Sequence, residues 1–247
     1  HNLIMGLGPD DTVHFAWSPL THYPENDSMF YQSQLATGNW SNIVEVPLVA
    51  MHRLDLESLE VAPNGTVHIL GMVTEGLYDT PSPYHFMRTP DATWSNSLIH
   101  AGQTYSTSDY YFTKNELAVD SQGVVHFALW DNDFSALKAI YRQWRPGTGW
   151  QPELILASDV WAAPLLVVDQ FDLLHILLQE NFLVTYRRSL PASSSGTAEL
   201  AQTFMIPVDM PAPTLAFMGR RFGDVAGNAS GAQLLVTVGM TTTAVTL

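Results

Sequence analysis

The chain of 247 residues contains no cysteine and few basic residues. Without cysteine, the protein has no disulfide framework, no thiolate ligands for zinc and no thiol nucleophile. Lysine and arginine together number 10 against 24 aspartates and glutamates, which gives a formal net charge of −14. Proteins that bind nucleic acid through a basic surface have the opposite balance. We therefore expect no nucleic-acid partner.

Long apolar runs are also absent from the sequence. The most hydrophobic stretch, residues 161–178, contains Asp169, Asp172 and His175, whereas a membrane-spanning helix needs about 20 nearly uninterrupted apolar residues. Hydrophobic residues nevertheless make up 46% of the chain and charged residues only 14%, a balance typical of a sequence that forms a packed core. The sequence therefore predicts a soluble globular protein without a membrane span.

A histidine recurs at regular spacing in four segments of similar sequence. The segments are GLGPDDTVHFAWS, EVAPNGTVHILGM, AVDSQGVVHFALW and VVDQFDLLHILLQ, and they contain His14, His68, His126 and His175. These histidines lie 54, 58 and 49 residues apart. Repeats with a period of this length are typical of propellers, solenoids and helical arrays.

A second set of aromatic residues follows the first three histidines. Tyr31, His85 and Tyr141 each precede a tryptophan by nine residues, and these tryptophans are Trp40, Trp94 and Trp150. The fourth repeat keeps Tyr186 but has PASSSGT in place of the tryptophan turn. We expect the histidines to bond the backbone or a neighbouring repeat and the aromatic residues to pack between repeats. Metal binding or proton transfer by the histidines is the alternative.

Each repeat predicts four short antiparallel strands joined by tight turns. In the clearest copy the strands cover residues 116–119, 124–130, 139–145 and 150–156, and glycines stand in the turns between them, as tight hairpins require. The strands are apolar on both faces, which is typical of sheets that are covered on both sides. Stacked four-stranded sheets of about 40–50 residues are the blades of a β-propeller.

The sequence thus predicts an all-β fold with a single β-propeller domain over residues 1–247. Its repeat units cover approximately residues 3–46, 57–99, 116–156, 164–206 and 214–247. We expect a five-bladed ring in which residues 3–6 complete the short fifth unit, because a closed ring leaves no exposed sheet edge. A fragment of a six- or seven-bladed ring is the alternative.

The third repeat carries the fullest version of two hairpin motifs. The first has Val119-Asp120, Gly123, Val125-His126-Phe127 and Trp130, and the second has Tyr141, Gly149-Trp150 and Pro152. In these motifs, VDxxGxVHhhW and YxxxxxGxxWSxP, the chain resembles secreted, sialidase-like (BNR or Asp-box-related) β-propeller proteins over roughly residues 3–206. The resemblance implies the propeller fold and a secreted, periplasmic or cell-surface protein. It does not imply sialidase activity, because the chain has no strict Asp-box and its arginines, apart from Arg53, fall toward the short-turn rim, so that three of them cannot meet on the long-loop rim.

Propeller topology separates the loops of the protein onto two rims. The segments that enter the first strand or join the second and third strands share one rim, and here they are long and varied, as in residues 100–115 and 131–137. Long loops on a rigid scaffold commonly bind ligands. The ligand-binding residues that we expect on this rim are Trp17, Tyr23, Tyr78, Asp79, Tyr110, Tyr111, Trp130, Asp131, Asp133 and Trp161. Aromatic rings beside carboxylates suit the apolar faces and hydroxyl edges of sugars.

Three acidic residues on the same rim are candidates for chemistry. Asp131, Asp133 and Glu180 are candidate catalytic carboxylates, because a glycoside hydrolase needs two carboxyl groups roughly 5–10 Å apart. Asp131 and Asp133 are also candidate calcium ligands, since they offer hard oxygen atoms at alternating positions. A solvated acidic surface is the alternative explanation for all three. We expect no cofactor, with structural calcium as the one candidate.

These patterns together predict an extracellular binding or interaction module that recognises a glycan or a protein surface through the long-loop rim. A glycoside hydrolase that uses a carboxylate pair on this rim is the main alternative, and a structural propeller domain of a larger precursor is another. Because the chain is strongly acidic, neutral sugars, cations or a basic partner are favoured over polyanionic ligands.

Overall fold

The computed structural model describes most of the first four repeats and the strands of the fifth. The described residues are 2–18, 28–46, 53–74, 81–101, 116–133, 136–160, 163–169, 171–180, 183–188, 200–205, 214–218, 233–238 and 241–246. Within these ranges the secondary structure is β-strand, turn and bend, without a helix. The all-β fold predicted from the sequence is therefore confirmed.

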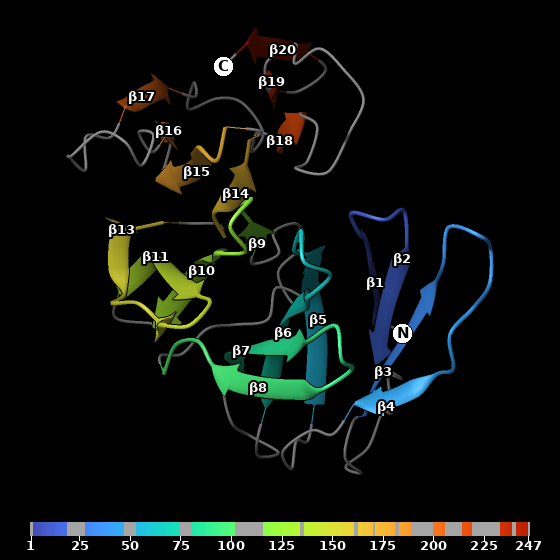
Figure 1. Ribbon diagram of the computed structural model, residues 1–247. Coiled ribbons are helices and arrows are strands. Elements are labelled where there is room, and N and C mark those ends of the chain that lie inside the picture. The colour runs from blue at the N-terminus through green and yellow to red at the C-terminus, as the bar shows by residue number, and fades with distance from the viewer. Residues whose placement is uncertain are drawn as a thin grey trace.

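Five antiparallel sheets follow one another along the chain, and we name them blades 1 to 5 (Figure 1). Blade 1 contains β1 (Asn2–Leu7), β2 (Val13–Ser18), β3 (Met29–Gln34) and β4 (Val44–Val46), and blade 2 contains β5 (Arg53–Val61), β6 (Val67–Thr74), β7 (Ser82–Arg88) and β8 (Trp94–Leu98). Blade 3 contains β9 (Glu116–Val119), β10 (Val125–Asp133), β11 (Ala136–Arg145), β12 (Gly149–Trp150) and β13 (Leu154–Ser158). Blade 4 contains β14 (Leu165–Val168), β15 (Leu174–Glu180), β16 (Leu183–Arg188) and β17 (Leu200–Met205), and blade 5 contains β18 (Thr214–Met218), β19 (Gln233–Val238) and β20 (Thr241–Thr246).

The order of contacts between blades is that of a β-propeller. Strands pair in chain order within each blade, and in blade 3 both β12 and β13 pair with β11 as two parts of the outer strand. The first strands of successive blades contact each other, β1 with β5, β5 with β9, β9 with β14 and β14 with β18. The blades therefore radiate from their first strands, as Figure 1 shows for an arc that runs from blade 1 to blade 5.

Two expectations from the sequence are wrong. Residues 3–6 do not complete the fifth blade, because β1 pairs along its whole length with β2 in blade 1, with Met5 opposite Phe15. Residues 131–137 do not form a long loop, because β10 continues to Asp133 and β11 begins at Ala136. Nine consecutive pairs join these two strands, so hydrogen bonding extends the hairpin to its tip. The number of blades in a complete ring stays a prediction.

The turn before each repeated histidine has one backbone geometry in four blades. In blade 3, the amide of Asp120 donates to the carbonyl of Val124, and the amide of Gly123 donates back to the carbonyl of Asp120. The fourth residue of this turn has a positive φ in every copy, at Asp11, Gly65, Gly123 and Asp172. Glycine adopts this conformation without strain, and aspartate tolerates it better than most residues.

The core lies between the blades, because the sheets of blades 2 and 3 bury both of their faces. In β6 all eight residues are buried, and odd and even positions pack against different neighbours. Ile69 joins the cluster shared with Ile4 and Ala16 of blade 1, while Leu70 joins the cluster shared with Phe127 of blade 3. The continuous apolar runs in the sequence thus reflect two separate interfaces for each blade.

We predict opposite stability effects for two exchanges at equivalent turn positions. Gly38 and Ala92 both follow the third strand of their blades and both have a positive φ, of 85° and 69°. A Cβ at Gly38 would meet no atom within 4 Å, so backbone strain alone decides the result. We expect Ala92→Gly to stabilise the protein and Gly38→Ala to destabilise it, each by about 1 kcal/mol. Urea unfolding measures both, and a stabilising Gly38→Ala would contradict the strain argument.

Candidate functional site

The repeated histidines form hydrogen bonds with the second set of aromatic residues in their own blades. The Nδ1 atom of His14 lies 2.6 Å from the hydroxyl oxygen of Tyr31, and Nδ1 of His126 lies 2.7 Å from that of Tyr141. In blade 2 the partner is another imidazole, since Nδ1 of His68 lies 2.9 Å from Nε2 of His85. The two sets seen in the sequence are therefore two halves of one buried polar pair, and the expected bond to backbone or to a neighbouring repeat is wrong for these three.

Burial keeps the histidines of blades 1 and 2 neutral. It lowers the pKa of His14 to about 4, with the charge of Arg88 adding to the effect and that of Asp10 opposing it. Burial also lowers the pKa of His68 to about 3 and holds the pKa of His85 well below its usual value. The same cause raises the pKa of Tyr31 and of Tyr141. Neutral partners that bond each other are the least costly way to bury polar groups.

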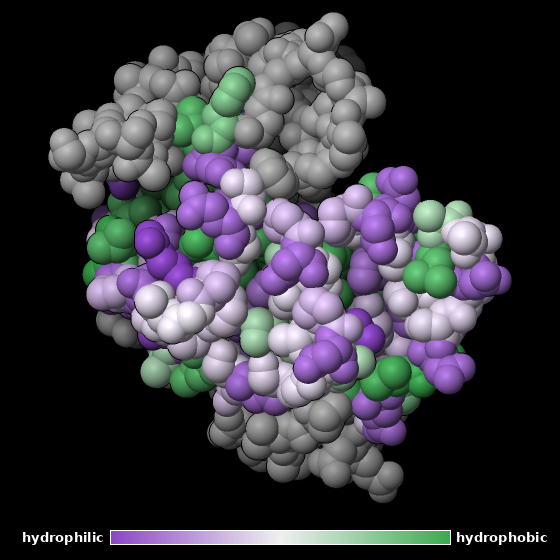
Figure 2. Space-filling view, viewed as in Figure 1, coloured by the Kyte–Doolittle hydropathy of each residue, from purple (hydrophilic) through white to green (hydrophobic). Residues whose placement is uncertain are grey.

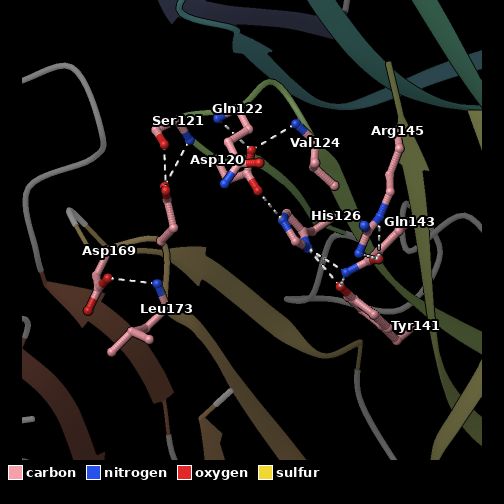
Figure 3. A network of polar contacts seen from close by, with 11 residues as sticks. Asp120, Ser121, Gln122, Val124, His126, Tyr141, Gln143, Arg145, Asp169 and Leu173 are labelled. Carbon is pink, nitrogen blue, oxygen red and sulfur yellow. Dashed lines mark hydrogen bonds and ion pairs between the residues drawn. The ribbon is translucent and has the colours of Figure 1, made fainter. Parts of the chain in front are cut away.

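An aspartate in the turn reaches the histidine from the other side in blades 3 and 4. In blade 4, Nε2 of His175 donates to Oδ2 of Asp169 at 3.0 Å, while Oδ1 of Asp169 accepts the amides of Phe171 and Leu173. In blade 3, Nε2 of His126 lies 3.5 Å from Oδ2 of Asp120. Figure 3 shows the resulting chain from the turn through His126 to Tyr141.

Polar and aromatic contacts also join neighbouring blades. The carboxylate of Asp172 in blade 4 accepts the amide of Ser121 in blade 3 at 2.8 Å and also bonds the Ser121 hydroxyl, which ties the turns of two neighbouring blades. Tryptophans from one blade pack edge-on against the polar pair of the blade before, Trp94 on Tyr31 and Trp150 on His85. The arrangement is structural, since the histidines are at most 7% exposed.

A different cluster of ionisable side chains lies where blades 2 and 3 meet, toward the rim opposite the turns that precede the repeated histidines. His100 follows β8, and its Nδ1 atom donates to Oε2 of Glu153 at 2.7 Å. Its Nε2 atom lies 3.6 Å from Oδ2 of Asp131 near the end of β10. His100 thus stands between two carboxylates that come from different strands of blade 3.

Two atoms in this cluster are buried without a hydrogen-bond partner among the described residues. They are Nε2 of His100 and Oδ1 of Asp131, and Asp131 is only 5% exposed. An unpartnered carboxylate oxygen is costly to bury, so it is a place where a bound group that donates a hydrogen bond gains most. The 3.6 Å between Nε2 of His100 and Oδ2 of Asp131 is too long for a direct hydrogen bond.

The residues predicted from the sequence lie in three situations. Asp131 is in the cluster just described. Trp130 is 7% exposed, packs between blades 3 and 4 and donates its indole N–H to the carbonyl of Val160, so it belongs to the core between these blades. Trp17 stacks on Phe30 at 5.8 Å in blade 1. The strand positions of Asp133 and Glu180 are described without their side chains, and Tyr23, Tyr78, Asp79, Tyr110, Tyr111 and Trp161 lie outside the described residues.

Sequence reasoning missed His100 and Glu153. They are 53 residues apart, as are Ser97 and Trp150, whose side chains also bond across the interface of blades 2 and 3. Residues separated by one repeat period therefore face each other between blades, and this spacing is the signal that could have found the pair. Among the described residues, no group of three histidine or acidic side chains is arranged to hold a metal ion.

Comparison with known proteins finds similarity in structure alone. No family model matches the chain, and no curated protein matches its sequence. The solved polysaccharide lyase Uly1 is similar over 94% of this chain and 53% of that chain, with a TM-score of 0.50 and 10% identity. A Bombyx mori GH32 β-fructofuranosidase in complex with sucrose is similar over 99% of this chain and 63% of that chain, with a TM-score of 0.46 and 9% identity. The chain spans less than two thirds of either protein, and the first likeness supports the fold.

The described residues also include no helix of the length and apolar character that crossing a bilayer requires.

The buried histidines predict that acid destabilises the protein above the range in which carboxylates titrate. An unfolded histidine binds a proton below pH of about 6.5, whereas folded His14 does so only near its pKa of about 4. The stability that neutral His14 contributes is therefore complete above pH 6.5 and is lost as the pH falls toward 4. We expect the Tm to fall between pH 7 and pH 5, and to fall less in His14→Gln. Equal slopes for the two proteins in circular dichroism melts would contradict this role.

Proposed function

We propose that this protein is an extracellular carbohydrate-binding propeller that holds a neutral glycan over the cluster of His100, Asp131 and Glu153. The observation that carries the proposal is the buried carboxylate of Asp131, whose Oδ1 atom has no hydrogen-bond partner among the described residues. A sugar hydroxyl can donate to this oxygen and accept from Nε2 of His100. A hydroxyl can donate one hydrogen bond and accept another at the same time, which a simple cation or anion cannot do.

The position of the cluster supports a binding role. It lies at the rim where the segments between blades enter the next blade, since His100 begins the connection from β8 to β9. That connection contains Tyr105, Tyr110 and Tyr111 in its sequence, which we propose as aromatic platforms for the apolar faces of sugar rings. Trp161, Tyr78 and Asp79 belong to neighbouring connections on the same rim and are proposed as further contacts.

Charge favours a neutral ligand over a polyanionic one. The formal net charge of the chain is −14, and the cluster adds two carboxylates to one imidazole. A uronic acid or sulfated sugar would meet this negative field at close range. The likeness to a polysaccharide lyase is consistent with a carbohydrate ligand, but the electrostatics of this chain point to an uncharged one.

Hydrolysis is the second candidate function, and the geometry of the described pair speaks against it. Asp131 and Glu153 lie on opposite nitrogen atoms of one imidazole, that of His100. His100 itself occupies the space between the two carboxyl groups, so a glycosidic bond cannot sit there. A hydrolase would instead need Asp133 or Glu180 as the partner of Asp131.

Asp131→Asn tests the binding site. The exchange keeps the side-chain volume but replaces one acceptor oxygen with a donor, so we expect binding of neutral oligosaccharides to weaken by about tenfold or more. We expect the Tm to stay equal or rise, because the variant removes a buried charge. A glycan array identifies the ligand, and titration calorimetry then compares the wild type, Asp131→Asn and the control Glu45→Gln on the exposed edge of blade 1.

The outcomes separate the candidate functions. Wild-type protein that binds no neutral glycan, or that binds charged glycans more tightly, would overturn the proposal. Release of reducing sugar that disappears in Asp131→Asn and also in Asp133→Asn or Glu180→Gln would establish a hydrolase that uses Asp131 with one of those two carboxylates.

A further inference from the structure

One face of blade 1 exposes a row of large apolar side chains. Leu3, Met5 and Leu7 of β1 are 60%, 66% and 56% exposed, and Trp40 is 53% exposed. Phe15 of β2 lies beside Trp40, with ring centroids 5.4 Å apart. Figure 2 shows hydrophobic residues at the surface over this blade. We name this the outer face of blade 1. Monomeric proteins rarely leave contiguous apolar surface of this kind in water.

The repeat shows what the outer face corresponds to in the other blades. Met5 lies opposite Phe15 in the β1–β2 pair. The equivalent residues in blades 2, 3 and 4 are Leu59 opposite Ile69, Leu117 opposite Phe127, and Leu166 opposite Ile176. Leu59, Leu117 and Leu166 are only 2%, 2% and 6% exposed. In each of those blades, the preceding blade covers this position.

Trp40 indicates the same missing neighbour. Its equivalents are Trp94 and Trp150, and each packs edge-on against the polar pair of the preceding blade, at 5.3 Å from Tyr31 and 5.7 Å from His85. Trp40 has its ring contact with Phe15 of its own blade. The outer face of blade 1 therefore has the composition and register of an inter-blade interface without the blade that would cover it.

The other end of the arc offers a blade with one neighbour. Strand β18 of blade 5 contacts β14 of blade 4. Among the described strands, those of blade 5 have no comparable contact with those of blade 1. Figure 1 shows blades 1 and 5 at the two ends of the arc. Since β1 is already paired with β2, the ends cannot join by exchange of a strand. They can join by packing face to face, as all other neighbouring blades do.

We propose that the outer face of blade 1 is the docking surface for blade 5 of the same chain, which closes the propeller. Blade 5 of the same chain is favoured over a second copy, because contact between covalently linked parts does not depend on the protein concentration. The strands of blade 5 are apolar enough to form such an interface, with LAFM in β18 and LLV in β19. The sequence of β20 is TTTAVT, which contains no aromatic residue.

The absence of cysteine from the chain makes a cross-linking test free of background. Met5→Cys is combined with Ala216→Cys or with Phe217→Cys in β18. Neighbouring residues of a strand face opposite sides of the sheet, so closure predicts that one pair forms an intramolecular disulfide under mild oxidation and the other does not. Mass spectrometry and non-reducing gels identify the product, and the same pairs in urea give the unfolded reference.

Labelling of a single cysteine gives a second measurement that does not depend on disulfide geometry. If blade 5 covers the face, Met5→Cys reacts with a maleimide about tenfold more slowly than Thr37→Cys in the exposed turn, because reaction then requires local opening. Equal rates together with no cross-link in either pair would overturn the proposal and leave the face open.

A lysine introduced into the outer face of blade 1 provides a third experiment, which distinguishes blade 5 from a second copy of the chain as the group that covers this face. Leu7→Lys lowers the Tm by several degrees if the face is covered, whereas Leu35→Lys, at a position that is 49% exposed, changes it by about 1 °C or less. Cross-links that form only between molecules, with a dimer in light scattering that Leu7→Lys dissolves, would show that a second copy is the occupant and overturn the proposal.

Discussion

Each blade of this protein is a single sheet that is apolar on both faces, and both faces must be kept from water. Burial of a leucine-sized side chain contributes about 1.5–3 kcal/mol, and the blades from 2 to 4 have rows of such residues on either side. A sheet of this kind is stable only between two others. Stacking of blades around their first strands satisfies that condition for blades 2 to 4, and it also sets the rims, the inter-blade contacts and the place of the candidate site.

Within this apolar stack, the polar pairs make the blades alike. In blades 1 to 3 a buried histidine is bonded to a tyrosine or to a second histidine, and in blades 1 and 2 burial keeps the histidines neutral. The aspartate of the turn bonds both its own backbone and the imidazole in blade 4, so one side chain links turn geometry to packing. Asp131 differs from the carboxylates of these turns, since its Oδ1 atom is buried and has no hydrogen-bond partner among the described residues. Asp120 and Asp169 both accept backbone amides in their turns, so the incomplete carboxylate of Asp131 points to a ligand there.

The repeat period carried most of the information about the fold. Spacing of the histidines and tryptophans predicted the sheets and the strands of blade 3, because each repeat has to bury the same two faces. It did not predict that β10 and β11 run on to the tip of their hairpin, since strand length is decided by pairing that composition does not show. It also did not indicate that Leu3, Met5 and Leu7 belong to an exposed face, because their pattern is the same as that of buried strands. The sequence predicted Asp131 in the site, but His100 and Glu153 meet it only through the contact of two blades.

In most of the described scaffold, apolar faces are covered by a neighbouring blade and buried carboxylates are hydrogen-bonded. The open face of blade 1 and the incomplete carboxylate of Asp131 are exceptions, and they have different physical meanings. An apolar row of known register has one kind of partner, a surface that supplies packing, because it offers no directional group to a small ligand. A buried carboxylate oxygen has the reverse preference, since only a hydrogen-bond donor of defined position compensates it. The two departures also lie apart, one on blade 1 and the other between blades 2 and 3. Closure of the ring would therefore complete the scaffold without filling the site, and a glycan would fill the site without replacing the missing blade contact.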